Sequence, residues 1–170
     1  MKRILSNRIG TIIKEKKGLE EALDVKLSNR GKELSIEGEP LEEYEAEKVI
    51  DALNFGFKIE IALMIKEKEL AFEVLNIKEF TKRKDMHAVR ARVIGTKGKT
   101  LKALTELTDC FIEVHENNVG IIGHPEKMKI AQEAIESLIR GSKQASVYKF
   151  LEKHHPKPIV DLGLKEKRKI

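Results

Sequence analysis

The stretch RARVIGTKGKTLKALTEL, residues 90–107, follows an apolar and basic helical pattern that stops at Gly-Thr-Lys-Gly and then resumes. Val89 and Val93 lie at helical spacing before the interruption, and Asp85 precedes them as a candidate N-cap. A glycine at each end of a four-residue link lets two helices meet at a tight corner, because glycine has no Cβ and adopts positive φ readily. The stretch therefore predicts a helix within residues 83–94, a short corner, and a second helix over residues 99–107.

This corner has two possible roles: a purely structural turn, or a device that brings the backbone close to a charged ligand. In the second case the amides of residues 95–98 and of the next helical turn point outward, where their free N–H groups and the helix dipole favour an anion. Lys97 and Lys99 would add positive charge, and Thr100 would add a hydroxyl. A structural turn explains the glycines but not the cations around them, which are Arg90, Arg92, Lys97, Lys99 and Lys102.

The segments on either side of the corner predict a small sheet. Residues 70–80, LAFEVLNIKEF, are rich in Phe, Val and Ile and predict a strand. After the corner, CFIEV (residues 110–114) and VGIIG (residues 119–123) predict two more strands around the polar turn HENN, and Gly-x-Pro then begins a long helix. The order strand, helix, corner, helix, strand, strand, helix predicts an α+β fold with a three-stranded sheet and helices on one face.

The same pattern occurs twice in the chain. Residues 34–53 and 119–138 align without a gap, so that Gly38 matches Gly123 and Pro40 matches Pro125, each pair 85 positions apart. The apolar positions around them match as well, which a chance Gly-x-Pro would not explain. The sequence therefore predicts two tandem copies of one module, each a three-stranded sheet with helices on one face.

The first copy lacks the glycine corner. In the ungapped register Gly10 stands opposite Gly95, but Ile13 stands where Gly98 would be. A gapped register instead places KEKK, residues 14–17, at the corner, with neither glycine. Nearby glutamates would also repel phosphate, so we expect a degenerate module that supports its neighbour or contacts a protein partner.

The order of elements around Gly95–Gly98 resembles the type I KH domain, whose GxxG loop grips the backbone of about four unpaired nucleotides. In such domains the bases lie in an apolar groove beside the loop. Here that groove would use Ile94, Leu101 and one face of the strand Ile112–Val114. The expected RNA-binding residues are Arg90, Arg92, Ile94, Gly95, Thr96, Lys97, Gly98, Lys99, Thr100, Leu101, Lys102, Ile112 and Val114.

Nearly the whole chain looks like the archaeal members of the "partner of Nob" family of KH ribosome-assembly proteins. The segments that carry the resemblance are VRARVIGTKGKTLKALTELT, VGIIGHP, IAQEAIESLIRGS and VYKFLEK. The resemblance implies a non-enzymatic factor that binds near the 3′ end of small-subunit rRNA and assists the PIN-domain endonuclease that matures that end. It also implies a link to the alpha subunit of initiation factor two. The alternatives are a general KH protein acting on mRNA or transcription-associated RNA, and an enzyme.

Composition agrees with a nucleic-acid-binding second half. Residues 1–80 hold 14 Lys and Arg against 17 Asp and Glu, whereas residues 81–170 hold 19 against 11. The single cysteine, Cys110, suits a reducing cytoplasm and a buried strand position. No run of residues is long and apolar enough for a membrane span. His154 and His155 are adjacent rather than spaced as metal ligands, so we expect neither a metal nor a cofactor.

The domain organisation expected from these patterns has four parts. Residues 1–55 would form the degenerate module, 56–69 a connecting helix, 70–141 the RNA-binding KH module, and 142–170 a C-terminal helix and basic tail. Phe111 should point to the sheet face opposite the helices. We expect that face to be covered by the other sheet or by a connecting helix within residues 54–65.

Overall fold

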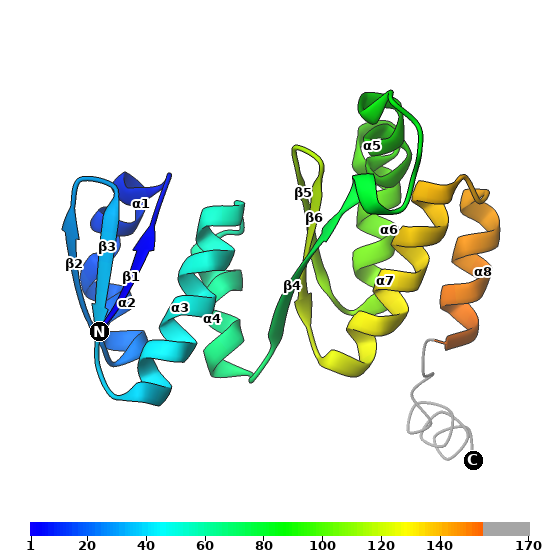
Figure 1. Cartoon of the computed structure of the whole chain (residues 1–170). Helices are drawn as coiled ribbons and strands as arrows, with labels where there is room; N and C mark the ends of the chain where they lie inside the picture. Colours follow the sequence, from blue (N-terminus) through cyan, green and yellow to red (C-terminus); the bar gives the residue numbers. More distant parts are fainter. Residues whose placement is uncertain (155–170) are drawn as a thin grey trace, which may run out of the picture.

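Two three-stranded antiparallel sheets, each with helices on one face, make up the computed structural model, which describes residues 1–154 (Figure 1). This arrangement confirms the predicted α+β fold of two KH-like modules. The basic tail expected at the C-terminus, LKEKRKI, lies outside the described residues. Within residues 1–154, no helix has the length and apolar character that a bilayer crossing requires.

The first module runs from the N-terminus to the end of a long helix. Its strands pair in the order β1-β3-β2, with Ile36 of the central strand opposite Lys2 and Leu27. Alternate residues of the central strand, Leu34 and Ile36, are buried against the helices. Its elements are β1 (Lys2–Leu5), α1 (Ile9–Lys14), α2 (Lys16–Leu23), β2 (Lys26–Arg30), β3 (Glu33–Glu37) and α3 (Pro40–Phe55).

The second module repeats this order after a connecting helix, α4 (Ile59–Glu67). Its strands pair as β4-β6-β5, which leaves β4 and β5 at the edges. Pro125 begins α7 as Pro40 begins α3, each at the first helical turn, where its missing N–H leaves no bond unmade. The elements are β4 (Ala71–Asn76), η1 (Ile77–Glu79), α5 (Met86–Ile94), η2 (Thr96–Gly98), α6 (Lys99–Thr108), β5 (Phe111–His115), β6 (Asn118–Gly123), α7 (Pro125–Arg140) and α8 (Gln144–His154).

The strand predicted over residues 70–80 is shorter than expected. It ends at Asn76, whose side chain accepts a hydrogen bond from the backbone N–H of Lys78 at 3.1 Å and so starts the turn η1. Ile77 follows as a fully buried side chain of the second core, and its N–H donates to the carbonyl of Asn117 at 2.8 Å. Burial of Ile77 beneath the helices turns the chain out of the sheet, an effect that residue composition alone does not reveal.

The outer face of the second sheet is covered by the connecting helix α4, one of the two predicted possibilities, together with the end of α3, and not by the other sheet. In Figure 1, α3 and α4 lie between the two sheets. Phe111 and Ile122 pack in the hydrophobic cluster of the first module rather than in that of the second. A Cβ on Gly120 would come within 2.7 Å of Phe55 and 2.9 Å of Phe57, so the aromatic rings rest directly on the sheet backbone. The two modules therefore share one continuous apolar contact.

Candidate nucleic-acid interface

The predicted corner is a tight turn between α5 and α6 that contains three residues with positive φ. Asp85 caps α5, accepting a hydrogen bond from Ala88 N at 3.2 Å as predicted. Gly95 ends the helix with φ 77° and ψ 172°, a conformation that is essentially restricted to glycine. Lys97 (φ 55°) and Gly98 (φ 73°) then lie in the left-handed region. Gly98 N donates to the Gly95 carbonyl at 3.2 Å, which closes the turn.

The two glycines of the turn serve different purposes. A Cβ on Gly95 would overlap the Thr100 hydroxyl and lie 2.7 Å from both the Cβ and the backbone nitrogen of Thr100. Gly95 is therefore required by the fold. A Cβ on Gly98 would meet no atom within 4 Å, so the space beside this residue is open. Gly98 is the point at which a ligand backbone can approach the chain closely.

Positive charge surrounds this open space. The side chains of Thr96, Lys97, Lys99 and Lys102 are exposed, whereas the glycines are half-buried. Over residues 1–154, none of the three lysines takes part in an ion pair with a carboxylate. The backbone amides expected to point outward are in part bonded within the chain, because the N–H groups of Gly95, Gly98 and Lys99 donate to the carbonyls of Ala91, Gly95 and Thr96. The positive potential therefore comes from the lysines and from the helix dipole at the start of α6. An anionic ligand is the natural complement of this surface.

The two arginines expected to flank the loop donate hydrogen bonds to other parts of the chain. Arg90 donates from Nη1 to the carbonyl of Glu116 at 3.2 Å and to Asn117 Oδ1 at 3.3 Å, which holds the β5–β6 turn. Arg92 donates from Nε to the Leu138 carbonyl at 3.1 Å and from Nη2 to the Ser142 carbonyl at 2.6 Å. Both guanidinium groups therefore have a structural task, and their contact with RNA stays a prediction.

Thr100 does not offer its hydroxyl to a ligand, contrary to the expectation from the sequence. Its side chain is 2% exposed and packs against Gly95. The hydroxyl accepts a hydrogen bond from Gln144 Nε2 at 2.9 Å, a contact between residues 44 positions apart. No local pattern marks Gln144, so this contact could not be read from the sequence.

Fewer of the expected apolar side chains are accessible beside the loop than the sequence suggested. Ile112 is 5% exposed and belongs to the second hydrophobic core, which removes it from the surface. Ile94, Leu101 and Val114 are half-buried and keep some exposed area beside the loop. Val114 lies on β5, which is an edge strand. These three side chains are the accessible apolar residues for stacked or packed bases.

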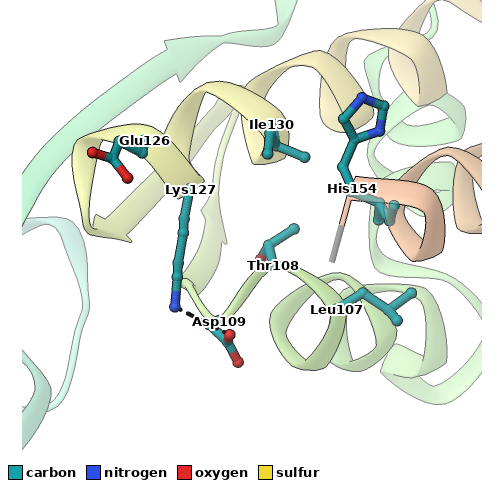
Figure 2. Close-up of a pocket in the computed structure, with 8 residues that line it drawn as sticks. Leu107, Thr108, Asp109, Glu126, Lys127, Ile130 and His154 are labelled. Atoms are coloured by element: carbon teal, nitrogen blue, oxygen red, sulfur yellow. Dashed lines mark hydrogen bonds and ion pairs between the residues drawn. The ribbon is translucent and has the colours of Figure 1, made fainter. Parts of the chain in front are cut away.

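A separate cavity of about 230 Å³ lies at the opposite end of α6 from the loop. Figure 2 shows Lys127 reaching toward Asp109, with the two groups 3.2 Å apart, while Leu107, Ile130 and His154 line the remaining walls. Among residues 1–154 no group of three or more His, Cys, Asp or Glu side chains is placed to hold a metal ion. The cavity is lined by charges of both signs, from Asp109, Glu126 and Lys127, and so lacks the purely cationic character of the loop.

Cys110 is a buried core residue, as predicted. It is 1% exposed, and its N–H donates to Thr108 Oγ1 at 3.3 Å. Burial raises the pKa of the Cys110 thiol, which keeps it protonated and unreactive near neutral pH.

The equivalent corner of the first module has a different construction. Helix α1 ends at Lys14 and α2 begins at Lys16, with only Glu15 between them. Gly10 lies inside α1, so the gapped register, with KEKK at the junction, is the correct one. Residues 14–17 include no glycine, although Gly18 follows in the first turn of α2 with no atom within 4 Å of an added Cβ. Glu15 and Glu21 are exposed near this junction. The first module therefore lacks the pair of positive-φ glycines found at positions 95 and 98, and it presents carboxylates beside its junction.

Comparisons with known proteins agree on one family. Residues 71–156 match the family model described as the eukaryotic type KH-domain, KH-domain type I. A KH domain-containing protein of Methanocaldococcus jannaschii is 34% identical over 166 residues, which cover 91% of this chain and 73% of that protein. Pre-rRNA-processing protein PNO1 of Yarrowia lipolytica is 33% identical over 102 residues, which cover 58% of this chain and only 40% of that protein.

Two solved structures resemble the whole fold. Dim2p from Pyrococcus horikoshii OT3 superposes with a TM-score of 0.82 at 29% identity, covering 89% of this chain and 98% of that one. The same TM-score and identity are found for a chain from the a/eIF2alpha–aDim2p–rRNA complex of Pyrococcus horikoshii OT3, covering 91% and 93% of the two chains.

Proposed function

Because the chain belongs to the PNO1 family of type I KH-domain proteins, we propose that it binds single-stranded RNA of the small ribosomal subunit precursor. Its target is the region near the 3′ end of the rRNA, whose maturation it assists by binding rather than by catalysis. The observation that carries this proposal is the open space beside Gly98, ringed by Lys97 and Lys99.

The binding mode follows from the geometry of the loop. A phosphate beside Gly98 would meet the positive end of the α6 dipole and the ammonium groups of Lys97 and Lys99. The adjoining bases would lie against Ile94, Leu101 and Val114. Duplex RNA does not fit this scheme, because its bases are paired and cannot turn into the groove.

We also propose two protein partners for this chain. The Pyrococcus horikoshii complex contains aDim2p, a/eIF2alpha and rRNA, which supports a similar link to the alpha subunit of initiation factor two here. A PIN-domain endonuclease is the second proposed partner. The first module is the proposed protein-binding part, because its helix junction lacks the open glycine corner.

The decisive experiment measures the affinity for a 3′ segment of small-subunit rRNA by fluorescence anisotropy. The double variant Lys97→Glu/Lys99→Glu should weaken binding by at least tenfold, because two phosphate contacts become repulsive. The matched control is Lys14→Glu/Lys17→Glu, which reverses the same charges at the equivalent junction of the first module and should change affinity far less. Equal losses in both variants would indicate nonspecific attraction to total charge and would contradict the proposed site.

Specificity needs a second measurement. Crosslinking to immature small subunits should place residues 95–99 on the 3′ region of the rRNA. Crosslinks that fall mainly on mRNA would instead identify a general KH protein with another target.

A further inference from the structure

The junction between α7 and α8 is bonded to both helices that form the RNA-binding loop. Arg92, near the end of α5, donates to the carbonyls of Leu138 and Ser142. Thr100, in the first turn of α6, accepts from Gln144 at the start of α8. One short segment, residues 138–144, therefore contacts the chain on both sides of the loop at residues 95–98.

Thr100 contacts both the end of α5, through Gly95, and the start of α8, through Gln144. Thr100 fills the space that a Cβ of Gly95 would occupy, so its rotamer sets how closely the end of α5 approaches the start of α6. Thr100 is buried, so leaving its hydroxyl without a partner would cost free energy. Its side chain therefore favours the rotamer in which the hydroxyl accepts a hydrogen bond. Gln144 is the side chain that supplies this bond from outside the module's sheet and loop.

Helix α8 is anchored well enough to hold Gln144 in place. It packs along α6 and α7, and its Val147 and Leu151 are buried in the second core. At its far end, Leu151 and His154 border the cavity of Figure 2. The helix therefore spans α6 from the loop to the opposite end.

We propose that Gln144 is a positioning residue for RNA binding, acting through Thr100 to fix the separation of Gly95 and the first turn of α6. This inference rests on the proposed function, since the shape of the loop matters only if the loop holds RNA. The three residues between Gly95 and Lys99 share that fixed separation, so the directions of the Lys97 side chain and the Gly98 amide depend on it. RNA affinity thereby depends on α8 through the Gln144–Thr100 hydrogen bond.

The test is a double-mutant cycle on RNA affinity, using Gln144→Ala and Thr100→Val. Each single variant removes the same hydrogen bond and should weaken binding by about fivefold, the usual worth of one such bond. The double variant should bind as each single variant does, because the bond can be lost only once. Ser146→Ala, also near the start of α8, is the matched control and should bind as the wild type does.

A readout without RNA separates positioning from a direct contact. The amide resonances of Gly95 and Gly98 should shift in Gln144→Ala and Thr100→Val alike, and stay in place in Ser146→Ala. The inference would be overturned if the losses of RNA-binding free energy in the two single variants added up in the double variant. It would also be overturned if Gln144→Ala weakened RNA binding while the amide resonances of Gly95 and Gly98 stayed in place.

The outcomes also distinguish this inference from the proposed function. If Gln144→Ala binds RNA as the wild type does while Lys97→Glu/Lys99→Glu loses binding, the positioning role is wrong and the function stands. If the wild-type protein does not bind the rRNA segment, the proposed function fails, and unmoved amide resonances would overturn the structural coupling as well.

Discussion

The two glycines of the GxxG loop should respond differently to replacement by alanine: Gly95→Ala should mainly lower stability, and Gly98→Ala should mainly lower RNA affinity. In Gly95→Ala, a glycine-only backbone conformation costs about 1–3 kcal/mol, and the new Cβ lies 2.7 Å from the backbone nitrogen of Thr100. Overpacking of this kind adds about 1–3 kcal/mol, so we expect the free energy of unfolding to fall by about 2–6 kcal/mol. In Gly98→Ala no atom lies within 4 Å of the new Cβ, and only the left-handed backbone costs energy, about 1–2 kcal/mol.

RNA affinity, measured on the folded protein, should fall more in Gly98→Ala than in Gly95→Ala. The Cβ added in Gly98→Ala occupies the open space where a phosphate approaches, so we expect the dissociation constant to rise by about tenfold although the fold is nearly intact. Urea denaturation followed by circular dichroism measures stability, and anisotropy at fixed salt measures affinity. Gly10→Ala is the control: Gly10 lies within α1 with no atom near its added Cβ, so the change should stabilise by about 0.5–1 kcal/mol. A Gly95→Ala protein as stable as Gly98→Ala would refute the assignment of roles.

Three further predictions concern the module contact, the buried thiol and the salt response. Gly120→Val should lower the free energy of unfolding by about 1–3 kcal/mol, because its side chain would displace Phe55 and Phe57; an unchanged urea midpoint would contradict the described contact. Cys110 should react slowly with iodoacetamide in the native protein and quickly in urea. Because burial raises the thiol pKa in the folded state, the free energy of unfolding should decrease as pH rises through the alkaline range. The Cys110→Ala protein should not show this decrease. The logarithm of RNA affinity should decrease with the logarithm of salt concentration by about 0.7 per phosphate contacted, and Lys97→Glu should reduce this slope.

Local sequence patterns predicted the elements of both modules well. The repeat at 85 positions led to two copies of one fold, and the Gly-x-Pro signature marked the start of both α3 and α7. Asp85 was correctly identified as a helix cap. These features depend on neighbours within a few residues, so their physical causes are present in any short window of the chain.

The loop chemistry was only partly predictable. The glycines and lysines specify an exposed, cationic corner, yet they do not reveal that Gly95 serves the fold while Gly98 leaves room for a ligand. That difference depends on where the Thr100 side chain lies after α6 has packed. In the same way, Ile112 was expected to line the groove but is buried in the core.

The sequence by itself determined the repeated module, the tight corner at residues 95–98 and the loss of that corner in the first copy. Only the tertiary structure decided which cations are free, because Arg90 and Arg92 find carbonyl partners 26 to 50 residues away. It also decided how α3 and α4 cover the second sheet, and how Gln144 reaches Thr100. The physical reason is that backbone conformation responds to adjacent residues, whereas hydrogen-bond partners and burial are set by which distant surfaces pack together.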